Sequence, residues 1–420
     1  MILLVFALLL IIGAPIAIAI GLASFVAMVQ EGISIDVFSR TIFSGIDSFT
    51  LMAIPFFIFA GDLMLAGGTS KRLIELAKKL VGWTTGGLPI AGVMASMLFA
   101  ALSGSSPATV AAIGGIMIPS LSDAGYSRRF AIGLMTAAGT LGIIIPPSIT
   151  LLVYGSSAGV SISDLFLAGV IPGVFIGLVL IIVSYIIAKR EGHEPEGAAS
   201  LGEVWNAFKA AIWGILLPII VLGGIYIGIF TPTEAAAIAI FYSLIIGLFV
   251  YKEITIKSLF DVTRRSVITS SMIMLVIAAS NVFSWYLTYE QIPTNLASFF
   301  LEYTNTQVLF LLLVIVILLV VGMFMDTSAA VLIFVPLFLP MVLELGVDPI
   351  HFGIVMIVTL SIGMITPPFG LNLFVAAGVS KAPLTEVIRG TFPFIIVMIL
   401  AALVIAFVPE LSLILLQLFE

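Results

Sequence analysis

Residues 102–109, with the sequence LSGSSPAT, separate two apolar runs at 88–101 and 110–118. Each run is too short to cross a bilayer, because a spanning helix needs about 20 residues. Basic residues bound the outer ends of the pair, at 78–79 and at 128–129. The pattern predicts a re-entrant hairpin whose helices enter from one face, meet at a polar tip and return. Irregular backbone at membrane depth is tolerated only where it is buried in protein or lines a wet cavity, so the tip is a candidate binding site.

The composition predicts an all-α polytopic membrane protein. Of the 420 residues, 61% are hydrophobic and 9% are charged, whereas soluble domains carry about 25% charged residues. The chain contains no cysteine, which excludes disulfides and thiol chemistry. The net charge of -6 lies in loops, and no charged tail indicates nucleic-acid binding. The first apolar run lacks a basic region before it, so we expect a retained span and not a signal peptide.

The apolar runs predict nine full spans and two half-length hairpins. The spans are expected near 2–29, 49–67, 130–154, 164–188, 211–229, 233–251, 266–288, 351–378 and 391–409, and the hairpins at 86–121 and 306–343. Lys and Arg concentrate in alternate loops, whereas 155–163, 289–305 and 344–350 contain neither. With a cytoplasmic N-terminus, every basic cluster lies inside only if each hairpin returns to its own side. The second hairpin then opens to the exterior, and the C-terminus is periplasmic.

The two halves of the chain form a repeat. Adding 221 to a position in the first half aligns Pro119 with Pro340, Gly142 with Gly363, Pro146-Pro147 with Pro367-Pro368, Pro172 with Pro393, and the two hairpin tips with each other. Because the hairpins face opposite sides, the repeat is expected to be inverted, with a binding site near the midplane between the halves. Chance recurrence of glycine and proline, which are common in membrane helices, is the alternative.

This organisation divides the chain into scaffold and transport segments. We expect scaffold helices with an interfacial arm helix at 1–85, a first transport repeat at 86–163, scaffold helices with a cytoplasmic loop near 189–210 at 164–305, a second transport repeat at 306–380, and a final scaffold helix with the C-terminus at 381–420. The arm helix is predicted at 71–80, where apolar positions share one face and Lys and Arg can extend to the interface. A solvated basic loop helix is the alternative.

A double proline breaks the span after each hairpin, at Pro146-Pro147 and at Pro367-Pro368. Proline removes a backbone donor and frees a carbonyl one turn back. The freed carbonyls of 142–145 and 363–366 can point at a cation, and the half-helices that follow present positive N-termini to an anion. A purely structural kink is the alternative reading.

These features predict a site with two similar halves. The first combines Ser103, Ser105, Ser106 and Thr109 with the break that includes Gly142, Pro146 and Ser148; the second combines Asp326, Thr327 and Ser328 with the break that includes Gly363, Thr366 and Asn372. Neutral oxygens with one carboxylate suit Na⁺ better than a transition metal. Asp326 is a functional candidate as an intramembrane acid, and it could also cap the helix that follows. Serine in a membrane helix often bonds only its own backbone.

Other ionisable residues indicate structural roles. Asp62 lies toward the end of its span and could simply reach the interface, and Glu234 in TPTE at 231–234 looks like an acid at a helix start. His193 and His351 have no partner pattern for a metal or a proton relay. The chain lacks a phosphate-binding Gly-Lys-Ser/Thr motif and a nucleophile–base pair, so it is not expected to be an enzyme or to use ATP itself.

Five motifs occur together: SGSSPAT at 103–109, IPPS at 145–148, TPTE at 231–234, GMFMD at 322–326 and ITPPFGLNLF at 365–374. Their combination resembles the large membrane subunit of tripartite ATP-independent periplasmic (TRAP) transporters over nearly the whole chain. The resemblance implies a bacterial or archaeal inner-membrane permease of the ion-transporter superfamily fold, working as an elevator driven by Na⁺. It also implies two partners, a small four-helix membrane subunit and a periplasmic substrate-binding protein. The tips lack the Ser-Asn-Thr triplet of related dicarboxylate/sodium symporters, which argues against that branch.

Carried onto this chain, the resemblance implies two Na⁺ sites at the paired tips and breaks, with the organic anion between Ser105, Ser106, Ser148 and Asp326. The expected function is Na⁺-coupled uptake of a small organic anion, most often a C4-dicarboxylate in this family, with sialic acid or another sugar acid as the alternative substrate. An ion-conducting channel is the competing class of function. An inverted repeat argues against a channel, because a pore favours symmetry about the membrane normal.

Overall fold

The computed structural model describes residues 2–195, 197–295 and 306–419, and over these residues it is helical, without a strand. Among the described residues, seven helices are long and apolar enough to span a membrane: α12 (Ile162–Arg190), α13 (Leu201–Tyr226), α14 with the π-helical segment η3 (Pro232–Val250), α15 (Ile256–Tyr289), α17 (Gln307–Phe324), α18 (Thr327–Glu344) and α21 (Leu384–Phe407). The chain is therefore a multi-pass membrane protein. Most of the predicted loop 289–305, and residue 196 of the loop near 189–210, lie outside the described residues.

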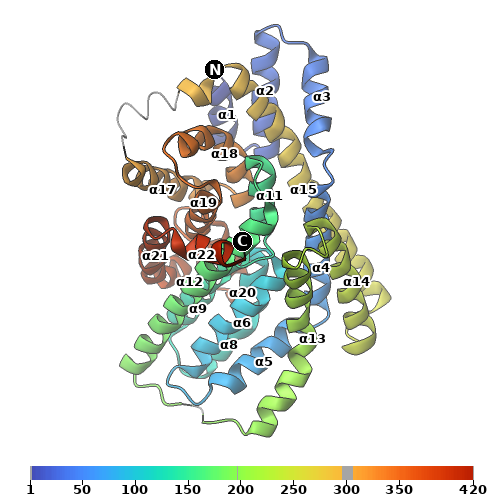
Figure 1. The fold of residues 1–420 in the computed structure, drawn as a ribbon. Helices are drawn as coiled ribbons and strands as arrows, with labels where there is room; N and C mark the ends of the chain where they lie inside the picture. Colours follow the sequence, from blue (N-terminus) through green and yellow to red (C-terminus); the bar gives the residue numbers. More distant parts are fainter. Residues whose placement is uncertain (1, 196, 296–305, 420) are drawn as a thin grey trace.

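The first hairpin forms where the polar stretch predicts it. Helix α6 (Gly87–Ser103) ends at Gly104, whose φ of +56° is the left-handed conformation that glycine adopts without strain. The returning arm comprises α7 (Ser106–Thr109), the π-turn η2 (Val110–Gly114) and α8 (Gly115–Asp123). Ser105 caps α7 through its hydroxyl. In Figure 1, both α6 and α8 lie in the lower half of the molecule.

The second hairpin has its tip at Met325 and Asp326, between α17 and α18. Its arms pack through aromatic rings: Phe310 of α17 contacts Phe338 of α18 edge-on, with ring centroids 6.4 Å apart. Phe310 also stacks on Phe352 of the following helix at 6.2 Å. Figure 1 shows α17 and α18 in the upper half of the molecule, opposite to the first hairpin.

Both predicted breaks are present. In the first, α9 (Arg128–Gly139) and α10 (Leu141–Ile144) are followed by α11 (Ile149–Ala158), with a bend of 42°. In the second, α19 (Pro349–Gly363) gives way to α20 (Leu371–Ser380). The two halves thus share the order hairpin, broken helix, long helix. Inversion of the repeat, the elevator motion and the division into scaffold and transport segments stay predictions.

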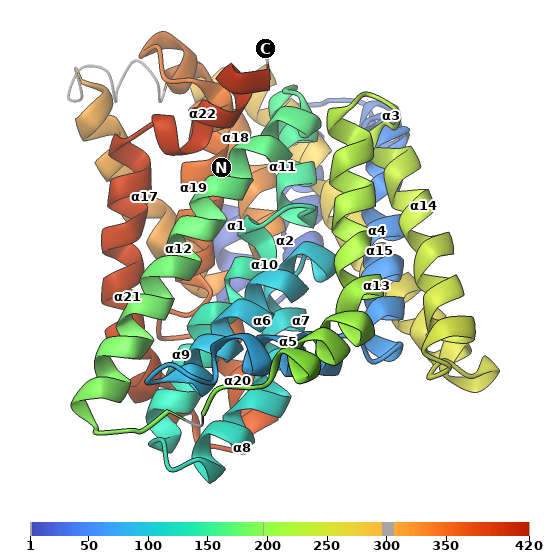
Figure 2. The same ribbon diagram turned by 60° about the horizontal axis from the view of Figure 1, so that its bottom comes forward.

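The N-terminal region differs from the prediction. The expected single span at 2–29 is two helices, α1 (Ile2–Ile11) and α2 (Ile16–Gln30), because Gly13 takes a φ of +82° and Pro15 begins a new helix. Helix α1 lies beside α2 and does not extend it (Figures 1 and 2). The prediction of a cytoplasmic N-terminus rested on that single span and loses its support.

The segment 30–48, interpreted as a loop, is also helical. Ser34 caps α3 (Ile35–Ile46), and after the turn η1 (Thr50–Met52) the chain bends by 61° into α4 (Ala53–Ala66). A capping residue that the apolar pattern did not reveal moves one further boundary, and one more helix was not expected. Ser200 starts α13 inside the predicted loop near 189–210 through a capping box with Glu203, and the C-terminal α22 (Glu410–Phe419) was not predicted.

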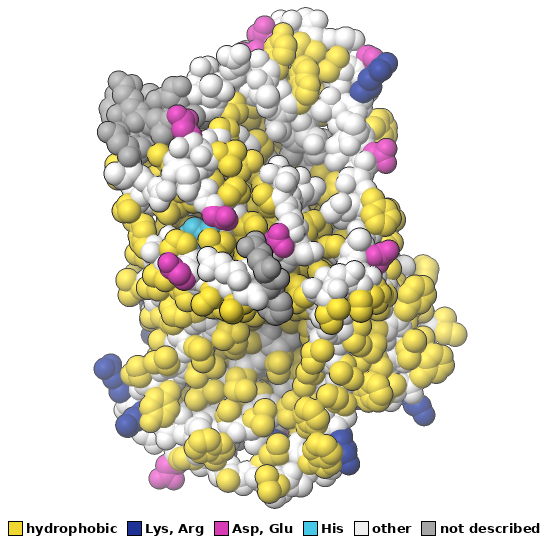
Figure 3. Space-filling model, viewed as in Figure 1, with side chains coloured by type: hydrophobic (Ala, Val, Ile, Leu, Met, Phe, Trp, Pro, Cys, Tyr) yellow, Lys and Arg dark blue, Asp and Glu magenta, His cyan; other side chains and the backbone are white. Residues whose placement is uncertain are grey.

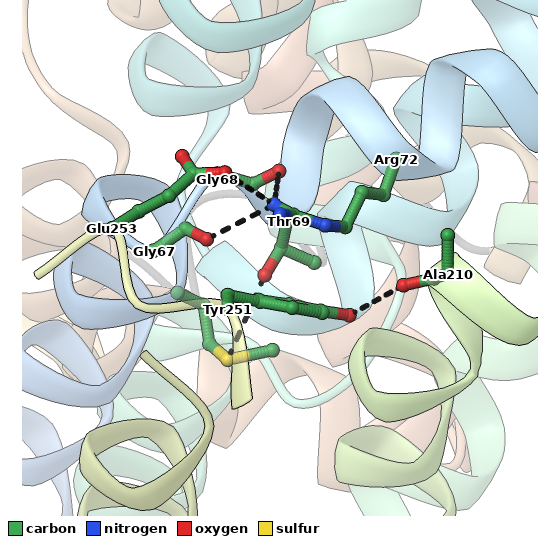
Figure 4. Close-up of polar contacts among 8 residues, drawn as sticks. Gly67, Gly68, Thr69, Arg72, Ala210, Tyr251 and Glu253 are labelled. Carbon is green, nitrogen blue, oxygen red and sulfur yellow. Dashed lines mark hydrogen bonds and ion pairs between the residues drawn. The ribbon is translucent and has the colours of Figure 1, made fainter. Parts of the chain in front are cut away.

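Helix α5 (Thr69–Val81) forms at the predicted arm, and it buries Leu73, Leu76 and Ala77 but leaves Leu80 41% exposed. Its first turn is fastened by Arg72 (Figure 4). The guanidinium donates to the carbonyls of Gly67 and Gly68 at 3.3 and 2.9 Å, pairs with the Glu253 carboxylate at 2.7 Å and lies 3.8 Å above the Tyr251 ring. These contacts join the α4–α5 turn to the segment that precedes α15.

Charge is distributed unevenly over the molecule. The face seen in Figure 3 carries its Lys and Arg side chains mainly around the lower part, where α5, α8 and the start of α13 lie in Figure 1.

Helices α9 and α21 meet backbone to backbone: a Cβ placed on Gly133 would overlap the carbonyl of Gly390. Small residues permit such close approach of membrane helices.

Candidate functional site

A cavity of about 460 Å³ lies where the two hairpin tips meet α4 and α15. It is lined by Ile58, Gly61, Asp62, Leu65, Phe99, Ser103, Gly104, Ser105, Pro107, Ala108, Ile143, Ile149, Thr150, Thr269, Met272, Ile273, Asp326, Thr327, Ser328, Met364 and Leu371. Five of the predicted site residues are therefore on its wall: Ser103, Ser105, Asp326, Thr327 and Ser328. The other predicted site residues are not among its lining residues: Ser106, Thr109, Gly142, Pro146, Ser148, Gly363, Thr366 and Asn372.

Oxygen atoms of the first tip converge next to Gly142. The Ser103 hydroxyl lies 3.0 Å from the Thr109 hydroxyl, which donates to the Ser105 carbonyl at 2.9 Å. A Cβ on Gly142 would overlap the Ser105 carbonyl and lie 2.5 Å from Thr109 Oγ1. Glycine at 142 thus allows the broken helix to approach a compact group of neutral oxygens, as the sequence predicts.

Ser148 holds the end of the first break together. Its hydroxyl donates to the Ile143 carbonyl at 2.7 Å and accepts from the Leu151 N–H at 3.4 Å, so that it caps α11. Gly104 at the hairpin tip approaches the Pro147 carbonyl so closely that a Cβ would lie 2.9 Å from it. Ser148 is buried at 1% exposure and shapes the break without facing the cavity.

At the second tip, Asp326 caps the following helix and also faces the cavity. Its carboxylate accepts from the Ser328 N–H at 2.9 Å and caps α18, and it also lines the cavity. The Thr327 hydroxyl lies 3.0 Å from Met364 Sδ in the second break. Tip and break are packed closely, since a Cβ on Gly322 would lie 2.9 Å from the Cα of Gly363.

Ser106 and Asn372 join the two repeats. The Asn372 Nδ2 group donates to Ser106 Oγ at 2.6 Å, although the sequence assigned these residues to different halves of the site. Asn372 is fully buried, and its Oδ1 atom has no hydrogen-bond partner among the residues that the structure describes. An unpaired buried acceptor is costly in a protein interior, so this oxygen is available to a ligand.

Asp62 is the site residue that the sequence did not indicate. It lines the cavity from α4 and accepts a hydrogen bond from the Ser266 hydroxyl of α15 at 2.6 Å. Asp62 is half-buried, and its place at the cavity depends on contact with α15, which its own segment of sequence does not reveal. By contrast, Glu234 forms the expected helix start, in a capping box with Thr231.

The cavity has two carboxylates and no Lys, Arg or His among its lining residues. Three helix N-termini supply positive potential instead: Ile149 and Thr150 begin α11, Thr327 and Ser328 begin α18, and Leu371 begins α20. Backbone N–H groups at helix N-termini bind carboxylates and phosphates. The arrangement can therefore hold an anion and cations together.

Comparison with known proteins agrees with this reading. Residues 3–411 match the family model described as the DctM component of tripartite ATP-independent periplasmic transporters. The isethionate TRAP transporter permease protein DctMQ of Oleidesulfovibrio alaskensis is 45% identical over 96% of this chain and 64% of its own length. The C4-dicarboxylate TRAP transporter large permease protein DctM of Pseudomonas aeruginosa is 46% identical over 89% of this chain and 87% of its own.

A more distant relative is the sialic acid TRAP transporter large permease protein SiaM of Vibrio cholerae, 37% identical over 97% of this chain and 96% of its own. Among solved structures, the YdaH transporter of Alcanivorax borkumensis superposes with a TM-score of 0.66 at 15% identity, over 89% of this chain and 88% of that one. This likeness concerns the fold alone. The chain therefore belongs to the DctM component family of tripartite ATP-independent periplasmic transporters, whose named members here are permease subunits and not enzymes.

Proposed function

We propose that this permease takes up a small organic anion, with a C4-dicarboxylate as first choice, and couples the uptake to Na⁺. The observation that carries the proposal is the charge of the cavity, which Asp62 and Asp326 make acidic without a basic residue on its wall. A dicarboxylate brought beside two carboxylates is repelled unless cations enter with it. Coupling to a cation follows from that requirement.

The described oxygens fit Na⁺ as a co-substrate. Na⁺ favours neutral and carboxylate oxygens over nitrogen or sulfur ligands. In the first repeat, we assign one Na⁺ to Ser103, Ser105 and Ser106 with the freed carbonyls near Gly142 and Pro146. In the second, we assign it to Asp326, Thr327 and Ser328 with Gly363, Thr366 and Asn372. The unpaired Oδ1 of buried Asn372 supports the second assignment.

For the organic anion, Ser105 and Asp326 are the predicted contacts that line the cavity. Ser106 and Ser148 are hydrogen-bonded behind its wall, to Asn372 and Ile143. We assign them to positioning the tip and the break. Because two relatives are named for isethionate and for sialic acid, a sulfonate or a sugar acid is the alternative substrate.

We further propose that the hairpins and broken helices move together as an elevator against α4 and α15, since the cavity lies on the seam between these two groups. By the positive-inside rule we assign the basic end seen in Figure 3 to the cytoplasm. We further propose a bacterial or archaeal inner membrane as the location, with a periplasmic C-terminus. A small four-helix membrane subunit and a periplasmic binding protein complete the system.

The test is uptake of labelled succinate and of sialic acid by proteoliposomes that contain this chain, its small subunit and its binding protein, with and without an inward Na⁺ gradient. Uptake that requires both Na⁺ and the binding protein supports the proposal and identifies the substrate class. Uptake without the binding protein indicates a conventional symporter, and current without saturable uptake indicates a channel.

A further inference from the structure

A second, smaller cavity of about 210 Å³ lies on the same seam, nearer to the end where α3 and α11 terminate. Its polar lining residues are Ser48, Ser156, Ser157, Ser280, Asn281 and Ser284. None of its lining residues is ionisable, and none is shared with the first cavity. It is therefore a separate, uncharged and hydroxyl-rich site.

The serine hydroxyls of this cavity depart from the usual hydrogen bonding of serine in membrane helices. Serines in the membrane helices of this chain commonly donate to the carbonyl four residues back, as Ser24, Ser96 and Ser184 do. The five serines of the cavity make no side-chain hydrogen bond to the described residues. Ser280 is 2% exposed, and its Oγ atom is unpaired. A buried hydroxyl without a partner is costly, and the Ser280 hydroxyl, with four more accessible serines around the same space, indicates a polar ligand.

One face of α15 lines both cavities. Thr269, Met272 and Ile273 line the first, and Ile277, Ser280, Asn281 and Ser284 line the second. The spacing of three and four residues keeps these positions on one side of the helix. The centres of the two groups are about 9 residues apart, or roughly 14 Å along the axis. One face of α15 therefore borders both cavities, with apolar Met272, Ile273 and Ile277 between the polar positions of the two.

The ligand must offer both donors and acceptors. The hydroxyls can donate, while the C-terminal ends of α3 and α11, near Ser48 and Ser157, add carbonyl acceptors and a negative partial charge. Both protons of the Asn281 amide are donated to the carbonyls of Gly45 and Ile277, which leaves Oδ1 as a further acceptor. A bare inorganic anion fits such a site poorly, whereas an organic acid that carries hydroxyl groups matches it.

We propose that this cavity is a second subsite for the transported organic acid, beside the extracytoplasmic half of α15, where it recognises the hydroxyl groups of the substrate. The inference rests on the proposed transport function. It adds that substrates with a hydroxyl group are distinguished from those without one by residues remote from the hairpin tips.

The experiment uses the natural absence of cysteine, which makes any introduced thiol the only one in the chain. Ser284→Cys and Ser280→Cys are compared with Ser184→Cys, whose parent hydroxyl is buried and bonded within its own helix. The complete complex in right-side-out vesicles is treated with the impermeant anionic reagent 2-sulfonatoethyl methanethiosulfonate. The proposal expects modification at 284, protection by L-malate and loss of uptake, with no modification at 184. Resistance of both cavity variants in vesicles whose unmodified chain transports overturns the subsite alone.

A second measurement avoids dependence on the thiol. Ser280→Ala should raise the KM for L-malate about fivefold, the effect of one lost hydrogen bond, and leave the KM for succinate unchanged. Ser184→Ala should change neither. Equal changes for both substrates overturn the hydroxyl recognition, whereas absence of any uptake by the unmodified complex overturns the proposed function itself.

Discussion

The amide of Asn372 donates a hydrogen bond to Ser106 Oγ over 2.6 Å, and the bond joins the tip of the first hairpin to the first turn of α20. Ser106→Ala leaves a buried amide proton unpaired, at a cost of roughly 1–3 kcal/mol. We expect Ser106→Ala, Asn372→Ala and the double variant to show a coupling energy of roughly 0.5–3 kcal/mol in thermal unfolding. Additive effects would mean that the two repeats are stabilised independently.

Gly142 provides a test of the first oxygen cluster. Gly142→Ala places a methyl group against the Ser105 carbonyl and Thr109 Oγ1, so the hairpin tip must shift. Uptake and its Na⁺ dependence should be lost. The control is Gly223→Ala in α13, where no atom lies within 4 Å of the added Cβ and helix propensity improves by about 1 kcal/mol. Transport by the Gly142→Ala protein at the level of this control would exclude a role for the cluster.

The helix-capping contribution of Asp326 and the contribution of its charge can be tested separately. Asp326→Asn keeps a side-chain oxygen for the Ser328 N–H but removes the charge, whereas Asp326→Ala removes both. We expect both variants to lose uptake, and only the alanine variant to lose about 0.5–2 kcal/mol of stability, the usual effect of a lost N-cap. Uptake and thermal unfolding in detergent are the readouts. Normal uptake by Asp326→Asn would exclude an electrostatic role for this residue.

Asp62 lines the cavity from the opposite wall and is bonded to Ser266. If its charge contributes to the requirement for cations, uptake by the Asp62→Asn variant should depend less on the Na⁺ concentration, or rise less steeply with it. Ser266→Ala removes only the hydrogen bond and should leave the steepness unchanged. Identical Na⁺ titrations for wild type and Asp62→Asn would restrict coupling to the hairpin tips.

Arg72 is predicted to stabilise the arm helix through its shape as well as its charge. Arg72→Lys keeps the charge but loses the planar fork that contacts Gly67, Gly68 and Glu253 and stacks on Tyr251. We expect a lower Tm for this variant. Arg40→Lys, in an ion pair exposed on both sides, should be neutral within about 1 kcal/mol. Equal Tm values for the two variants would show that the Arg72 contacts are dispensable.

The sequence predicted those parts of the site that depend on local chemistry. Polar tips and double prolines inside apolar runs are visible along the chain, and the hairpins and breaks formed where those signals lie. The fold-back of α1 on α2 was missed because hydropathy does not report direction, and only Gly13 and Pro15 mark the turn. Asp62 and the Ser106–Asn372 bond depend on contacts between distant segments, which no local pattern contains.

The close approach of α9 and α21 affects how the protein responds to its lipids. With Gly133 and Gly390 in backbone contact, there is no room for an acyl chain or a detergent molecule between the helices where they cross. A bilayer that is thicker or thinner than the helices must be accommodated by tilt or local lipid deformation. We expect that adjustment at outward-facing helices such as α13 and α14, with Ile219 and Phe241 at their surfaces, while the α9–α21 pair keeps its spacing. Lipid thickness would then change the tilt of the periphery before it changes the shape of the binding cavity.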